Sequence, residues 1–365
     1  YYTFSVILMQ LKSFNRTFTF HFFHYALKWN CSDTGIYRYN MEEFMNQKAL
    51  KVLEYDKIIQ LLAEQATSDA GKKRCLELVP MTDKQLITDA QAQTADALSR
   101  IYRKGNISFG GLKDPGFQMK RLEIGGCLNA AELLSICTLL EITRRAKAYS
   151  RENRDDLPAD SLDVLFAGLE PLTPLLEEIR RCILAEDEIS DDASSTLRQI
   201  RRSIKATNDR IHTQLSSLVA GSARNYLQDS VITMRDGRYC IPVKAEYKGQ
   251  VPGMIHDQSA TGSTLFIEPM AVVKLNNDIR ELELKEQKEI EVILASLSQQ
   301  VAAELEAIHA DLSIMVQLDF IFARAALAMD MNASEPVFNT EGRIRLRQAR
   351  HPLIDKKKAV PIDIR

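Results

Sequence analysis

Three side chains in one short stretch are of the types that bind metal ions or transfer protons. His256 and Asp257 are adjacent, and Glu268 follows them in the same β-rich stretch. Imidazole and carboxylate groups are ligands in many hydrolytic metal sites, so a metal-dependent nuclease is one interpretation. Three such residues on a small sheet are also common as a hydrogen-bonded structural group, and we favour that interpretation.

Basic and aromatic side chains share this stretch. They are Arg235, Arg238, Lys244 and Lys248, together with Tyr239 and Tyr247. Cationic side chains bind backbone phosphates, and aromatic rings stack on bases. Lysines also protect the edges of sheets against association. The cluster therefore predicts either a nucleic-acid contact or a protected sheet edge.

Other chemistry is not indicated by the sequence. No GxxxxGK[ST] phosphate loop occurs, because Gly71-Lys72 lacks the earlier glycine, and we therefore expect this chain alone neither to bind ATP tightly nor to hydrolyse it. The six cysteines contain no CxxC pair, which predicts a reducing, cytoplasmic setting without disulfides or a zinc site. The net charge of −2 means that any nucleic-acid binding depends on local patches.

The candidate residues lie on two predicted hairpins. Residues 231–234 and 239–243 are β-rich and flank an Asp-Gly pair, which favours a tight turn because both turn residues need positive φ. Residues 253–256 and 263–267 flank a second loop, which is rich in Asp, Ser, Thr and Gly. A β-rich segment over 225–269 is predicted.

Long helical patterns enter and leave this segment. Apolar residues recur every three or four positions over 186–224, where Ser190 is the expected helix start and Gly221 the stop. The opposite face carries five cations, which predict a solvated face rather than a phosphate-binding stripe: Arg198, Arg201, Arg202, Lys205 and Arg210. Residues 270–332 hold no Gly or Pro after Ala271, so one continuous returning helix is predicted, antiparallel to the first.

The remaining ranges frame these arms. Residues 41–185 predict a helical core, including a helix capped by Ser68. Residues 333–365 alternate like strands and predict the opening of a further domain. Residues 1–40 are rich in aromatic residues but too interrupted by charge for a membrane span, and we expect a non-native or disordered extension before a natural start at Met41.

Several stretches together resemble one family. They are RDGRYCIPVKAEYKGQVPGMIHDQSATGSTLFIEPMAVVKLNNDIREL, LKVLEYDKIIQLLAEQATSDAGK, FGGLKDPGFQMKRLEIGGCLNAAELL, EDEISDDASSTLRQIRRSI and RQARHPLID. These resemble the MutS family in its second bacterial branch, from about Met41 to Arg365. The resemblance implies a mainly α (α+β overall) fold with a helical core, antiparallel lever helices, a β clamp at their tip and the first strands of an ATPase domain.

The resemblance also implies partners and cofactors. The intact protein would be a homodimeric ATPase that uses ATP and magnesium, with a C-terminal endonuclease domain. It would bind branched or mismatched DNA, suppress recombination, and act on stalled ribosomes and their rRNA. The family's adenine-side segment has its counterpart at Val360, Pro361 and Ile362. The family's catalytic residues have no counterpart in this sequence, so we expect a core, lever and clamp portion that is inactive alone.

Two interpretations from other classes stay open at this point. One is a structural coiled-coil module with a hinge at its tip, which would bind no nucleic acid. The other is the metal-dependent nuclease centred on His256, Asp257 and Glu268.

Overall fold

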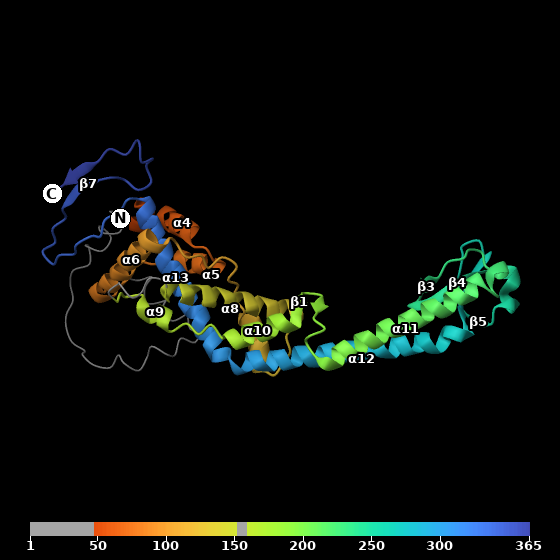
Figure 1. Cartoon of the computed structure of the whole chain (residues 1–365). Coiled ribbons are helices and arrows are strands. Elements are labelled where there is room, and N and C mark those ends of the chain that lie inside the picture. The colour runs from red at the N-terminus through yellow and green to blue at the C-terminus, as the bar shows by residue number, and fades with distance from the viewer. Residues whose placement is uncertain (1–46, 152–158) are drawn as a thin grey trace. The chain divides into compact units, whose positions relative to one another are not determined.

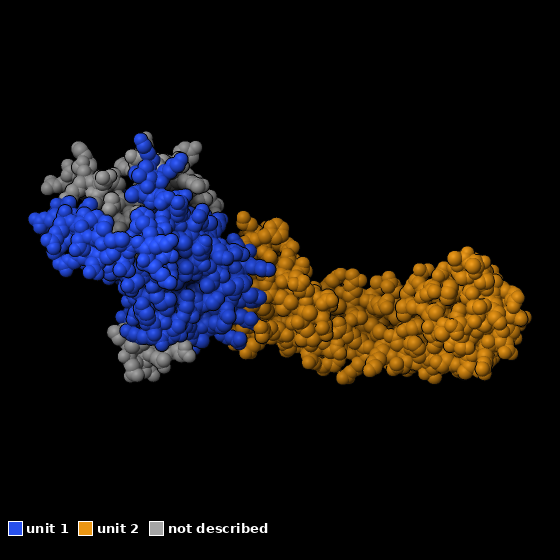
Figure 2. All heavy atoms as spheres, turned by 90° about the horizontal axis from the view of Figure 1, so that it is seen from above, with its two compact units in different colours: residues 1–114, 138–171, 306–365 blue, residues 115–137, 172–305 orange. Residues whose placement is uncertain are grey.

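The computed structural model of this chain describes residues 47–151 and 159–365. The predicted extension and the start at Met41 lie outside these residues. The described residues are mainly helical, with three small antiparallel sheets, which confirms the mainly α class. Figure 2 shows two compact units: unit 1 takes residues 1–114, 138–171 and 306–365, and unit 2 takes residues 115–137 and 172–305. The finer functional division predicted from the sequence stays a prediction.

Unit 1 is built from helices and one short sheet. Its elements are α3 (Gln47–Val52), α4 (Tyr55–Gln65), α5 (Asp69–Leu76), α6 (Lys84–Lys104), α9 (Asp163–Ala167), α13 (Leu305–Asp330), β7 (Leu346–Ala349) and β8 (Ile362–Ile364), and α8 (Ala130–Arg151) contributes from residue 138 on. The predicted cap of α5 is confirmed, because the Ser68 hydroxyl accepts a hydrogen bond from the Gly71 N–H at 2.9 Å. Strands β7 and β8 pair antiparallel.

Helix α13 is the central helix of unit 1. By length and composition it could cross a membrane, but more than half of its apolar window is buried within the protein. Its Asp319 side chain is buried and accepts four hydrogen bonds, two from Thr67 and two from Ser68, at 2.6–3.0 Å. A buried carboxylate that ties α13 to the segment between α4 and α5 in this way identifies a core helix of a globular unit.

Unit 2 contains the predicted arms and the β-rich segment. Its elements are α7 (Gly116–Glu123), α10 (Thr173–Cys182), β1 (Ile183–Ala185), β2 (Glu188–Ile189), α11 (Ser195–Ala220), η1 (Arg224–Tyr226), β3 (Thr233–Arg235), β4 (Arg238–Lys244), η2 (Ala245–Gln250), β5 (Gly253–Gln258), β6 (Thr264–Pro269) and α12 (Met270–Ala303). Helices α11 and α12 lie side by side, with the sheet at one end of the pair (Figure 1).

Polar contacts establish that α11 and α12 are antiparallel. The Ser194 hydroxyl donates to the Glu289 carboxylate at 2.7 Å, and the Arg201 guanidinium meets Glu286 at 2.7 Å. From the first contact to the second, the residue number rises in α11 and falls in α12, so the predicted antiparallel pairing is confirmed. Both partners of the second pair are only about a quarter exposed, so solvent screens this pair less than a surface ion pair.

Two predicted helix boundaries are wrong. Helix α11 begins at Ser195 with Ser194 as its cap, because the Ser190 hydroxyl instead accepts from the Asp192 N–H within the turn after β2. The continuous helix over 270–332 is broken at Glu304, where φ is −108° and ψ is 14°. Neither Glu304 nor the alanines before it disfavour a helix, so the packing of α12 and α13 in different units decides this break.

The β-rich segment folds as one four-stranded antiparallel sheet in the order β3-β4-β6-β5, which with η1 and η2 we call the tip (residues 224–269). The Asp-Gly hairpin is confirmed: Arg235 pairs with Arg238, and Asp236 and Gly237 have φ of 50° and 71°. These positive values are those of a two-residue hairpin turn.

One face of the tip sheet forms the local core. Ile241, Val243 and Ile267 are fully buried there, together with apolar residues of α11 and α12 that include Ile211 and Val272. Because side chains alternate along a strand, the even-numbered residues of β4 and β6 project to the other face. That second face carries the polar candidates Arg238, Lys244 and Glu268.

Candidate nucleic-acid interface

The predicted basic cluster is divided between the two ends of β4. Arg238 begins the strand and Lys244 ends it, which at roughly 3.3 Å per residue separates them by about 20 Å. Arg235 pairs with Arg238 across the hairpin, whereas Lys248 lies in η2, beyond Lys244. The arginines and the lysines therefore belong to different environments.

Arg235 is held by two neighbours on the sheet. Its guanidinium lies 3.9 Å from the centre of the Phe266 ring and forms an ion pair with Asp257 at 3.0 Å. Stacking on a ring and pairing with a carboxylate both occupy a guanidinium. Arg235 therefore links β3 to β6 and β5, and its charge is locally balanced.

Arg238 belongs to a buried polar network around Glu268, whose side chain is fully buried. The Glu268 carboxylate accepts from Arg238 at 2.8 Å and from the Asn276 amide at 2.8 Å, and it meets His256 Nε2 at 2.6 Å. Arg238 also donates to Asn277 at 2.6 Å. The network thus joins three strands of the sheet to the first turns of α12.

Hydrogen bonding decides the charge state of Glu268. Burial by itself raises the pKa of a carboxyl group, because it disfavours the ionised form. The hydrogen bonds from Asn276, His256 and Arg238 act in the opposite direction and outweigh burial, so the pKa of Glu268 lies below its ordinary value of 4.5. The site therefore holds a carboxylate anion at neutral pH.

The side chains of the alternative metal site do not converge on one point. His256 and Glu268 bind each other, while Asp257 binds Arg235. The pairing register of β5 shifts between Ile255 and Asp257, where His256 lies. Because of this shift, the neighbouring side chains of His256 and Asp257 bind different partners. Within residues 47–151 and 159–365, no group of three or more His, Cys, Asp or Glu side chains is arranged to hold a metal ion. This geometry supports the structural interpretation of the set.

Lys244 and Lys248 are the predicted cations that remain available. Lys248 is exposed and Lys244 is half-buried, with its ammonium 5.9 Å from the centre of the Tyr247 ring. In the described part of the chain, no carboxylate lies within ion-pair distance of either lysine. The nearest acidic residue along η2 is the exposed Glu246.

The two predicted tyrosines pack against the tip's own core. The Tyr239 ring meets the His212 ring edge-to-face at 5.0 Å, and the Tyr247 ring meets the Tyr226 ring at 5.3 Å. Both rings are half-buried beside the apolar cluster. Their main role in this structure is to fill space between the sheet, α11 and η2, and any stacking on bases stays a prediction.

A hydroxyl-rich loop lies beside Lys244 and was not among the predicted site residues. It runs from Ser259 to Ser263 between β5 and β6, and Ser263 O accepts from the Ala245 N–H at 3.0 Å. The run of Ser and Thr next to a glycine was a visible signal, but strand pairing is needed to bring it next to the lysines.

The cationic face of α11 is partly paired. Arg201 binds Glu286 and Asp191, and Arg198 binds Asp192. Arg202 and Lys205 are exposed on the same helix. The solvated-face interpretation agrees with these contacts.

The predicted adenine-side residues lie on or next to β8. Val360 is 76% exposed and Ile362 is 54% exposed, and Pro361 between them is exposed as well. They offer apolar contact only, and the sequence holds no glycine-rich loop for phosphates. The residues of this chain therefore do not fit ATP with magnesium, and we derive no step through either.

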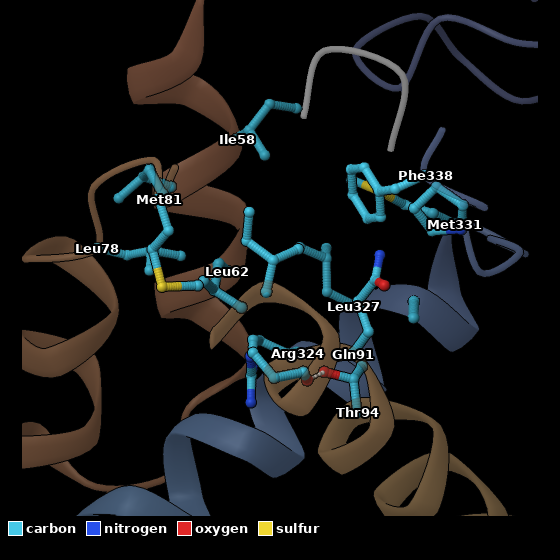
Figure 3. A pocket seen from close by; sticks show the side chains of 15 residues that line it. Ile58, Leu62, Leu78, Met81, Gln91, Thr94, Arg324, Leu327, Met331 and Phe338 are labelled. Carbon is cyan, nitrogen blue, oxygen red and sulfur yellow. Dashed lines mark hydrogen bonds between the residues drawn. The ribbon is translucent and has the colours of Figure 1, made fainter. Parts of the chain in front are cut away.

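Unit 1 contains an apolar cavity of about 140 Å³ (Figure 3). Ile58 and Leu62 of α4, Leu327 of α13 and Phe338 line it, and Arg324 and Gln91 lie at one side. Its wall is almost entirely apolar, with Gln91, Thr94 and Arg324 as its polar members. It is not part of the basic surface.

Known proteins resemble this chain over most of its length. No protein-family model matches it. "Endonuclease MutS2" from Agathobacter rectalis is 58% identical over 322 residues, that from Lachnoclostridium phytofermentans 51% over 326 residues, and that from Acetivibrio thermocellus 44% over 321 residues. These alignments cover 87–88% of this chain but only 40–41% of each relative. The chain thus spans about two fifths of the length of the curated relatives it matches.

Proposed function

This chain belongs, over the residues that match, to the MutS2 branch of the MutS family, and we propose on that premise that its tip is a clamp that binds the DNA backbone. The observation that carries the proposal is the pair of lysines at the end of β4 and in η2, Lys244 and Lys248, which no carboxylate neutralises among the described residues. Phosphate contacts position a protein on nucleic acid without reading its sequence. Binding is therefore expected to be independent of base sequence.

The helix pair supports a lever role in this proposal. The Arg201–Glu286 ion pair and the Ser194–Glu289 hydrogen bond fix α11 against α12, and the Glu268 network fixes α12 to the sheet. A displacement of α12 along its axis would thus be passed to the tip. In the intact protein, we propose that a homodimer uses this lever on branched or mismatched DNA and suppresses recombination.

We propose no nuclease role for the tip. "Endonuclease" is part of the relatives' printed name, but His256, Asp257 and Glu268 are engaged with one another and with Arg235. Ribosomes and rRNA carry the same phosphate chemistry and are the second expected target of the intact protein. Cosedimentation of the chain with ribosomes, without binding to DNA, would replace DNA by ribosomal RNA as the target.

A salt titration tests the proposed clamp. Binding of the full chain to a short mixed-sequence duplex is measured by fluorescence anisotropy between about 50 and 200 mM salt. Lys244→Ala with Lys248→Ala is expected to lower the slope of log K against log[salt] by about 2, because each lost phosphate contact removes about 0.9. Fold stability is expected to change by less than about 0.5 kcal/mol, since Lys248 is exposed and neither lysine forms an ion pair among the described residues.

The matched control is Arg202→Ala with Lys205→Ala, two exposed cations on α11. The clamp proposal is wrong if the control lowers the slope and the lysine variant does not. A chain whose binding is undetectable, or does not vary with salt, would instead favour the structural hinge module.

A further inference from the structure

Three hydroxyl groups gather at the turn between β5 and β6. Thr261 Oγ1 lies 2.8 Å from Ser263 Oγ and 3.4 Å from Ser259 Oγ. Thr261 and Ser263 are exposed, whereas Ser259 is half-buried. Three hydroxyl hydrogens serve these two contacts, so one hydrogen remains for an acceptor outside the loop.

The loop is held in place without any ligand. The Ser259 hydroxyl accepts from the Thr264 N–H at 3.0 Å, and the Gly262 N–H donates to Ser259 O at 2.8 Å. Gln258 closes the turn through its side-chain amide, which donates to Gly262 O at 3.1 Å. Gly262 has φ of 72°, a value that glycine adopts without strain. A turn already ordered in this way loses little conformational freedom when it binds.

Strand pairing sets this loop next to Lys244. Lys244 is the register partner of Thr264, the residue that follows Ser263. The Ala245 N–H donates to Ser263 O at 3.0 Å, so the hydroxyl loop and the start of η2 lie at the same end of the paired strands β4 and β6. The exposed residues Thr261 and Ser263 thus lie close in the fold to the backbone of Lys244.

We infer that the hydrogen-bonded hydroxyl pair of Thr261 and Ser263 donates its one remaining hydrogen to a DNA backbone phosphate next to the one neutralised by Lys244. This inference rests on the proposed clamp function and extends it to two neutral residues. A phosphate oxygen accepts from hydroxyl groups as well as from cations. The lysine supplies charge, and the hydroxyls, whose directions are set by the turn, supply orientation of the backbone.

The contribution of the hydroxyls can be measured separately from that of the lysine, because only the lysine carries a charge. Thr261→Val with Ser263→Ala removes both hydroxyls without changing charge. In the anisotropy assay with the same duplex, the dissociation constant of the full chain is expected to rise on the order of 10-fold at fixed salt. The salt slope is expected to stay unchanged, because no counterion-releasing contact is lost. Lys244→Ala is expected to lower that slope by about 1.

The control is Thr213→Val, which removes an exposed hydroxyl on α11 that donates to Asp209 O within its own helix. It should leave the dissociation constant unchanged. All variants should have the same melting temperature as the parent chain.

Failures of the two proposals give different results. An unchanged dissociation constant for the hydroxyl variant, with weaker binding of the lysine variant, overturns this inference and leaves the clamp intact. A changed salt slope in the hydroxyl variant overturns it as well. If the parent chain itself binds no duplex, both proposals are wrong.

Discussion

The buried carboxylate of Glu268 is the feature whose removal should affect the tip most. Replacement by Gln keeps the side-chain volume but removes the charge. The amide oxygen of Gln can still accept from Arg238 and Asn276, and its NH₂ group can face His256 Nε2. What the variant loses is the ionic part of the bonds, above all the bond to Arg238.

The expected cost of Glu268→Gln is about 2 kcal/mol of tip stability. Hydrogen bonds to a charged group contribute about 1.5–3 kcal/mol, compared with about 1 kcal/mol for neutral ones. The Arg238 side chain is 28% exposed, so water compensates part of the loss. Glu268→Ala should cost more, about 3–5 kcal/mol, because it leaves buried donors without an acceptor.

Low pH should remove the difference in tip stability between the parent chain and the Glu268→Gln variant. Since the pKa of Glu268 is lowered in the folded state, the carboxylate contributes its full stability above the ordinary value of 4.5. That contribution is lost as the pH falls through the lower, folded-state pKa. The two proteins should therefore differ by a constant amount at neutral pH and converge in acid, below the ordinary pKa.

Hydrogen–deuterium exchange of peptides from β4, β6 and the start of α12 measures this local stability. Exchange in Glu268→Gln should be faster there by a factor of roughly 30, which corresponds to about 2 kcal/mol. Glu246→Gln, an exposed glutamate of the same tip, is the control and should exchange like the parent chain. Equal protection in Glu268→Gln and the parent at neutral pH would refute the reasoning, as would a difference that persists undiminished in acid.

Two further substitutions test other contacts. Asp319→Asn should destabilise unit 1 by about 3 kcal/mol in urea unfolding, because the new amide NH₂ group would face two of the four donors of Thr67 and Ser68, which are buried or part-buried. A loss under about 1 kcal/mol would contradict the role of this carboxylate. Gly253→Ala should separate β5 from β6, because a Cβ atom would lie 2.2 Å from Glu268 O, and exchange in β5 reports it. Gly249→Ala, where a Cβ meets nothing within 4 Å, is the control and should have no such effect.

Local chemistry made many elements of this fold predictable. The Asp-Gly pair at 236–237 predicts a hairpin because both positions need positive φ, and the structure has it. Ser68 as a helix cap and Gly221 as a helix stop are likewise confirmed. These signals depend on residues within four positions of each other, so no tertiary contact is required to interpret them. The family resemblance rests on longer stretches of this same kind.

Contacts between residues distant in sequence decide which of the four predicted cations remain without a carboxylate partner. The sequence places Arg235, Arg238, Lys244 and Lys248 within fourteen residues of one another, which predicts a single basic cluster. The fold pairs the arginines with Asp257 and Glu268 and leaves both lysines without a carboxylate partner among the described residues, with Lys244 next to the Ser259–Ser263 loop. Which cation is neutralised depends on strand register, and register follows from burying one face of the whole sheet.

The break between α12 and α13 has the same origin. Residues around Glu304 favour a helix, and no local signal there ends one. Helix α12 packs along α11 with one apolar side, whereas α13 is buried among the helices of unit 1. Tertiary burial contributes far more free energy than the few tenths of a kcal/mol that separate helix-favouring residues, so packing set the boundary that the sequence alone did not specify.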